Sequence, residues 1–236
     1  MIDVNNVPNR IRRSTVGQRS AILISGLTTL FTAISPASAA ESPELISPWT
    51  PVTVKSDDAG VEVGVWGRSH KLANSALPAS IVTAGDEILA APVRLVGQVS
   101  GKPIEWNRRG GNFVFHADQS HAVITGWQAG DDLIVNSTTR IEFDGLVRVD
   151  LVVLPQHKTS PKIEQLWLEV PLERSRAGLF HYFPGRWGTA KNSGALPETG
   201  LVLPFKPFVW LGCEESGLSW FAESDEAWRP QAADRA

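Results

Sequence analysis

The sequence is poor in cysteine and in surplus charge, and both shortages restrict what the protein can be. Cys213 is the single cysteine among 236 residues, so no disulfide can form within the chain and a hydrophobic core must stabilise the fold. The formal net charge is −3, without the clustered Lys and Arg that nucleic acids or anionic membranes attract. We therefore expect neither of these partners.

Several enzyme motifs are missing as well. The sequence contains no GxSxG, HExxH or GxxxxGK[ST], so it does not support α/β-hydrolase, zinc-protease or P-loop chemistry. His116 and His121 flank a turn and could face each other, with Asp118 as a third metal ligand. A turn-flanking pair without a second cluster is weak evidence for a metal, so the sequence assigns no metal and no other cofactor.

The first 39 residues have the order of a secretory signal peptide. Four arginines precede the apolar run Ala21–Ile34, and the small residues of SPASAA follow it. The run is shorter than the roughly 20 residues that span a bilayer, and this order of charged, apolar and small residues is typical of a cleaved signal. We expect a secreted or periplasmic bacterial protein with no membrane segment after cleavage.

The rest of the chain has the pattern of an all-β fold. Short runs rich in Val, Ile, Thr and aromatic residues, such as GVEVGVWG and LVRVDLVVL, alternate with Gly, Pro, Asn and Asp clusters. No stretch keeps a 3.6-residue apolar period, which favours an antiparallel β-sandwich over βαβ units. The expected layout is a signal peptide (1–39), a linker (40–51), the β-sandwich domain (52–228) and a C-terminal tail (229–236).

The pair Asp144-Gly145 predicts a hairpin within TTRIEFDGLVRVDL. A three-residue or bulged connection would pair Phe143 with Val147, which places apolar side chains on one face. The same register predicts two cross-strand ion pairs on the other face, Glu142–Arg148 and Arg140–Asp150.

Residues 205–228, FKPFVWLGCEESGLSWFAESDEAW, combine aromatic and acidic side chains. We expect a hairpin of the strands 209–211 and 218–222, with the turn 212–217 between them. Two carboxyl groups across a glycosidic bond could hydrolyse it, and the acids whose spacing permits this are Glu214, Glu215, Glu223, Asp225 and Glu226. Solvated acids beside aromatic strands are the more ordinary state, so no residue is assigned a catalytic role.

A long segment of turn composition, Pro184–Gly200, offers a different function. It carries Arg186 and Trp187 between glycines, and an exposed indole and guanidinium can stack on a sugar and hydrogen-bond to it. Trp106, in the WNRRGG turn, is a third candidate for carbohydrate binding. A tryptophan packed back onto the domain is the alternative in each case.

The aromatic and acidic segment resembles part of the large secreted bacterial proteins of glycoside hydrolase family 123. The similarity extends more loosely to DGLVRVDLVVLP and IEQLWLEVPL. It implies an N-terminal β-sandwich domain followed by a catalytic (β/α) barrel that acts on N-acetylgalactosaminide-type glycans. The family's catalytic Asp and Glu lie in that barrel, so no position here matches them. Cys213 departs from the family pattern, in which an acid usually follows WLG.

Three functions stay open at this point. The first is the accessory sandwich of an exported glycoside hydrolase, a truncated or split product whose partner is a downstream catalytic barrel. The second is a free-standing carbohydrate-binding module with a glycan as its ligand. The third is a surface structural domain without a ligand.

Overall fold

The computed structural model describes residues 45–106, 110–158, 161–183 and 190–224, and all of them belong to one compact unit. The expected signal peptide and C-terminal tail, and residues 40–44 of the expected linker, lie outside these ranges. No helix in the described part of the chain has the length and apolarity needed to cross a bilayer.

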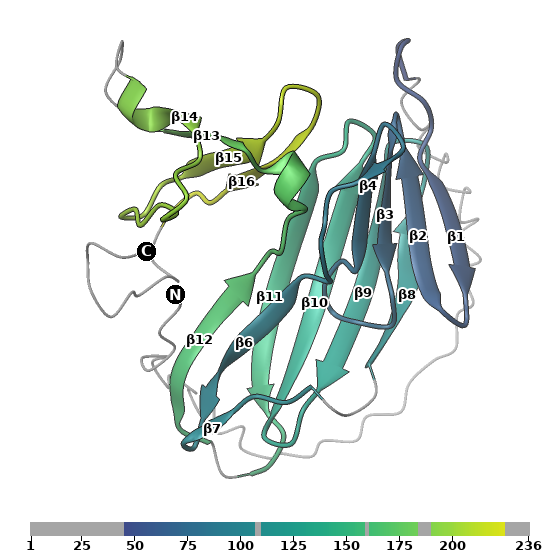
Figure 1. Cartoon of the computed structure of the whole chain (residues 1–236). Helices are drawn as coiled ribbons and strands as arrows, with labels where there is room; N and C mark the ends of the chain where they lie inside the picture. Colours follow the sequence, from purple (N-terminus) through teal and green to yellow (C-terminus); the bar gives the residue numbers. More distant parts are fainter. Residues whose placement is uncertain (1–44, 107–109, 159–160, 184–189, 225–236) are drawn as a thin grey trace, which may run out of the picture. The chain divides into compact units, whose positions relative to one another are not determined.

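Two of the four antiparallel sheets consist of strands that follow one another along the chain (Figure 1). The first sheet, in the order β1-β2-β3-β4-β5, contains β1 (Thr53–Asp57), β2 (Gly60–Val65), β3 (Arg68–Leu72), β4 (Ser80–Thr83) and β5 (Asp86–Glu87). The second sheet, in the order β11-β10-β9-β8, contains β8 (Gly110–Ala117), β9 (His121–Ala129), β10 (Leu133–Glu142) and β11 (Val147–Pro155).

The other two sheets include pairings between strands that are not consecutive. In the third sheet β6 lies between β12 and β7, with the bounds β6 (Arg94–Val99), β7 (Lys102–Pro103) and β12 (Ile163–Glu169). The fourth sheet, in the order β14-β13-β15-β16, contains β13 (Leu179–Phe183), β14 (Ser193–Ala195), β15 (Phe208–Gly212) and β16 (Gly217–Phe221). Two short 3₁₀ helices accompany them, η1 (Arg174–Arg176) and η2 (Ala190–Asn192).

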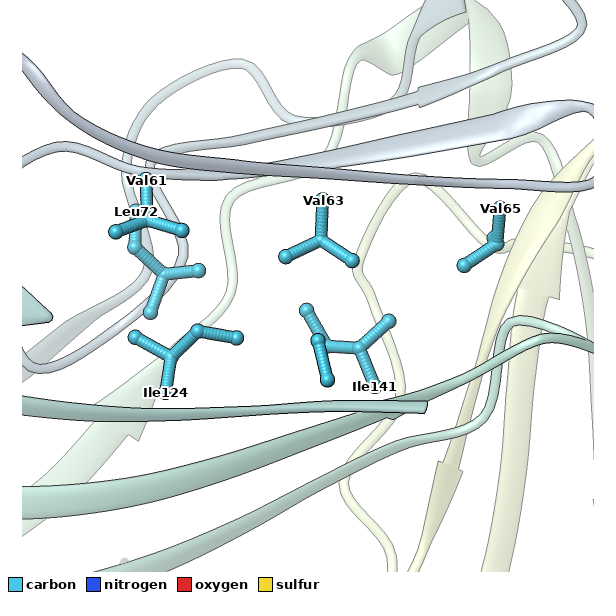
Figure 2. Close-up of a cluster of buried hydrophobic side chains, with 7 residues drawn as sticks. Val61, Val63, Val65, Leu72, Ile124 and Ile141 are labelled. Carbon is cyan, nitrogen blue, oxygen red and sulfur yellow. The ribbon is translucent and has the colours of Figure 1, made fainter. Parts of the chain in front are cut away.

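The first and second sheets pack face to face through an apolar cluster (Figure 2). Alternation along each strand directs every second side chain inward, and on β10 the buried positions are Leu133, Val135, Ser137, Thr139 and Ile141. Figure 2 shows Val63 of β2 pointing toward Ile141, and both side chains are completely buried. Full burial of one such side chain contributes about 1.5–3 kcal/mol.

A second cluster connects the same face of β10 with the third sheet. It includes Leu95 of β6, Val135 of β10 and Leu166 of β12. The expectation of an all-β antiparallel fold is therefore confirmed. A simple sandwich has two sheets, whereas the described residues form four. The third sheet is separate from the first because β6 pairs with β12 and not with β5.

The β10–β11 hairpin forms at Asp144-Gly145, but its predicted register is wrong by two residues. Val147 lies opposite Ile141, where the sequence analysis placed Phe143. The four residues 143–146 connect the strands, and the Gly145 N–H donates to the carbonyl oxygen of Glu142 at 2.9 Å. The predicted cross-strand ion pairs are replaced by pairs along each strand, Arg140–Glu142 and Arg148–Asp150.

Candidate functional site

Of the three predicted carbohydrate-binding residues, Trp106 alone lies within the described part of the chain. Arg186 and Trp187 lie outside the described residues. Trp106 packs against the second apolar cluster, and its indole N–H donates to the carbonyl oxygen of Leu95 at 2.6 Å. The polar edge of Trp106 is thus already used within the domain.

The C-terminal hairpin forms as the sequence predicts, with β15 and β16 joined by the turn 213–216. Alternation brings four aromatic side chains to one side of the fourth sheet, which we call the aromatic face: Phe183, Phe208, Trp210 and Phe221. The rings of Phe208 and Phe221 lie 5.0 Å apart between centroids. Phe183 and Phe221 remain 47% and 62% exposed, so the aromatic face presents apolar surface to solvent.

Two glycines make room for the indole of Trp210 on this face. A Cβ atom at Gly212 would collide with the Trp210 ring, and one at Gly217 would lie 2.7 Å from its Nε1. Both glycines lie at the hairpin end of their strands, opposite each other. The indole consequently covers bare backbone there, an arrangement that a larger residue at either position would prevent.

An arginine ties the fourth sheet to the first. The guanidinium of Arg176, in η1, lies 2.6 Å from a carboxylate oxygen of Asp86 in β5 and 3.5 Å from one of Glu215 in the β15–β16 turn. Only a fifth of the Arg176 side chain is exposed. Arg176 therefore pairs closely with the first sheet through Asp86 and more loosely with the acidic turn, because the side chain of Glu215 is 83% exposed.

The same turn changes the acidity of Cys213. A hydrogen bond with Ser216 and backbone N–H groups of Glu215 and Ser216, with a smaller contribution from Arg176, lower the pKa of the thiol to about 7. The sulfur lies 3.6 Å from the Ser216 hydroxyl oxygen. A thiol with this pKa is partly ionised near neutral pH.

Three of the acids that were considered for hydrolysis lie within the described residues. Glu214, Glu215 and Glu223 are exposed, and Asp225 and Glu226 lie outside the described residues. Other carboxylates gather at an open hollow of about 490 Å³ that is lined by Val99, Lys102, Pro103, Ile104, Glu105, Asp131, Asp132 and Leu133. The sequence analysis did not consider this group.

A second exposed surface lies on the outer side of the second sheet. Cross-strand pairing aligns Gly111, Trp127, Asn136 and Val152 in one row from β8 to β11. Trp127 is 40% exposed, and a Cβ atom at Gly111 would lie 2.9 Å from its Nε1. The sequence analysis missed Trp127, although the alternation along β9 places its side chain on the same outer face as those of His121, Val123 and Thr125.

One group of side chains could hold a metal. Donor atoms of His116, Asp118 and His121 all lie within 4.8 Å of one another at the β8–β9 turn. Hydrogen bonds, chiefly from the Ser120 hydroxyl and also from His116 and backbone N–H groups, hold the pKa of Asp118 well below its usual range. Asp118 is therefore an ionised carboxylate between two imidazoles at neutral pH.

Residues 54–230 match the family model described as Glycoside hydrolase 123, third domain. The chain belongs to this family. The glycoside hydrolase 123 resemblance of the aromatic and acidic segment is thereby confirmed, and the match extends to most of the chain. The resemblance implied an N-terminal domain of these proteins, whereas the matching description is that of the third domain. No curated protein matches the chain.

Proposed function

We propose that this chain is a non-catalytic accessory domain of an exported glycoside hydrolase 123 protein, whose aromatic face packs against a catalytic barrel. The protein is secreted or periplasmic, and its substrates are N-acetylgalactosaminide-type glycans. The order of charged, apolar and small residues in the first 39 positions supports export. The family resemblance supports the substrate class.

The exposure of the aromatic face is the observation that carries the proposal. Aromatic side chains dominate the energetics of protein interfaces, and contiguous exposed apolar surface marks a contact site. On the aromatic face Phe221 is 62% exposed beside Phe208. Exposed acids of the neighbouring turn, Glu214 and Glu215, provide the polar rim that such interfaces have.

Association in trans tests this proposal. The full chain is mixed with a separately produced catalytic barrel of a family member, and the complex is measured by size-exclusion chromatography and calorimetry. We expect a complex that Phe221→Ala weakens. Phe115→Ala is the matched control, because Phe115 is an exposed phenylalanine outside the aromatic face. A complex that is insensitive to Phe221→Ala, or equally sensitive to both variants, contradicts docking through this face.

A second function, carbohydrate binding, is favoured by the row around Trp127. An indole over a glycine, beside the exposed amide of Asn136, offers a stacking surface and a hydrogen-bonding group. Thermal unfolding of the full chain with N-acetylgalactosamine-containing oligosaccharides tests it, since a ligand of the folded state stabilises that state by RT ln(1 + [L]/Kd). A rise in the melting temperature that Trp127→Ala removes and Phe115→Ala preserves supports a binding module. No rise, or one that survives Trp127→Ala, excludes this surface.

A further inference from the structure

The β8–β9 turn is held in a fixed conformation by a dense set of hydrogen bonds. One carboxylate oxygen of Asp118, Oδ1, accepts bonds from the N–H groups of Ser120 and His121 at 2.7 and 2.9 Å. The Val52 N–H donates to the carbonyl oxygen of Gln119, and the Phe143 N–H donates to that of Ser120. The other carboxylate oxygen, Oδ2, lies 3.2 Å from Nε2 of His116.

A β-bulge directs His116 to the same side of the sheet as His121. Val114 pairs with Ile124, but His116 pairs with Val123, so Phe115 is an extra residue in β8. Val114 packs against the first apolar cluster, and without the bulge His116 would share its inward direction. Bulges commonly redirect a side chain in this way. Here both imidazoles reach the outer surface beside Asp118.

The carboxylate of Asp118 lies close to both imidazoles, and the donor atoms of the three residues all lie within 4.8 Å of one another. His116 Nε2 lies 3.2 Å from Asp118 Oδ2, and His121 Nδ1 lies 3.3 Å from Asp118 Oδ1. Ligands about 2.0–2.2 Å from a tetrahedral ion lie about 3.4 Å from one another, so the two imidazoles must draw together around the carboxylate to complete the site. His116 is half exposed and His121 is mostly buried, which leaves one side open for entry of the ion.

We propose that His116, Asp118 and His121 bind a divalent transition-metal ion, with Zn²⁺ as the preferred ion. Two imidazoles and one carboxylate are ligands that suit Zn²⁺ and disfavour Ca²⁺ or Mg²⁺, which prefer oxygen donors. Three protein ligands leave a fourth position for water or a group of another molecule. The sequence analysis considered these three residues and assigned no metal, because a turn-flanking pair without a second cluster is weak evidence. The bulge at Phe115, which turns His116 outward, becomes visible only in the structure.

Ser120 gives the site a specific competitor. Its hydroxyl oxygen lies 2.7 Å from Asp118 Oδ1 and 2.9 Å from His121 Nδ1. His121 Nδ1 donates to the hydroxyl oxygen in one tautomer and accepts from it in the other, and in either case it gives up this bond when it binds an ion. When His121 Nδ1 binds the ion through its lone pair, the hydroxyl is free to donate to Asp118, and the turn keeps its internal bond.

Titration of the full, untagged chain with ZnCl₂ by calorimetry tests the site, with the melting temperature as a second readout. We expect one ion per chain and a rise in melting temperature. His116→Ala and Asp118→Asn should each weaken Zn²⁺ binding at least about tenfold. Loss of a residue that only hydrogen-bonds to a metal ligand already lowers metal affinity by about this factor. Asp118→Asn keeps a side-chain oxygen for the turn, and circular dichroism of each variant verifies the fold.

His157→Ala is the matched control, because His157 is exposed and lies outside the cluster. It is expected to bind Zn²⁺ as the unaltered chain does. The proposal is overturned if the unaltered chain takes up no Zn²⁺, if His116→Ala binds as tightly as the unaltered chain, or if His157→Ala abolishes binding.

Discussion

Replacement of His70 by leucine should remove most of the pH dependence of stability above pH 5. His70 lies on β3 opposite Val63, is 3% exposed, and neither ring nitrogen has a hydrogen-bond partner among the described residues. Burial, and secondarily the positive charge of Arg68, lower its pKa from 6.5 to about 4. The folded protein thus holds a neutral imidazole where the unfolded chain can bind a proton.

The size of the effect follows from this difference in pKa. The unfolded state binds more protons than the folded state between pH 6.5 and about 4, so stability falls as the pH falls through this window and levels off below it. One pKa unit corresponds to about 1.4 kcal/mol, which gives about 3 kcal/mol in total and about 2 kcal/mol between pH 7 and pH 5. Carboxylates with a lowered pKa, such as Asp118 and Glu87, lose their contributions only at lower pH.

Urea unfolding at pH 7 and pH 5 measures this loss directly. The unaltered chain is expected to lose about 2 kcal/mol of unfolding free energy between these pH values, and His70→Leu is expected to lose little. Leucine has a similar volume and no unsatisfied nitrogens, so it suits the buried position. His157→Gln, at an exposed histidine, should keep the full loss. If His70→Leu loses as much unfolding free energy between pH 7 and pH 5 as the unaltered chain, His70 is not the cause of the pH dependence.

Two further predictions concern the thiol and the turns. The rate of Cys213 alkylation by iodoacetamide should rise with pH around a midpoint of about 7, and Ser216→Ala should raise that midpoint; a midpoint near 9 for the unaltered chain would contradict this. Gly60→Ala should lower the free energy of unfolding by at least about 3 kcal/mol, because its Cβ would collide with the Leu72 carbonyl oxygen. Gly67→Ala, with open space around it, should cost about 1 kcal/mol. Urea unfolding measures both losses, and equal losses of unfolding free energy in Gly60→Ala and Gly67→Ala would contradict this prediction.

Alternation along a strand was enough to predict faces, but not to fix pairings. In the β10–β11 hairpin the apolar residues lie on the predicted side although the register is wrong, because a shift by two residues keeps the parity of every side chain. The ion pairs were mispredicted for the same reason, since each depends on the exact opposite residue. Arg140 thus lies opposite Arg148 and pairs with Glu142 on its own strand.

The sequence did not predict which strands pair when they are far apart along the chain. The hairpin of residues 208–221 was predictable because its strands are close in sequence and a glycine lies at each end of the turn between them. The β6–β12 pairing joins residues about seventy positions apart, and no local pattern specifies it. The convergence of His116 and His121 depends on an unpaired Phe115, and the surface around Trp127 depends on a row across four strands. The sequence therefore showed His116, Asp118 and His121 as a possible group without the geometry that supports it. The row around Trp127 becomes visible only when the registers are known.

The hydrolysis of an aryl N-acetylgalactosaminide by the purified full chain tests the central claim most directly. An accessory domain that lacks the family's catalytic acids should release no phenol above the buffer rate. Saturable release by the chain alone would contradict the claim. Loss of that release in Glu105→Gln or Asp132→Asn would then place the activity at the carboxylate-lined hollow.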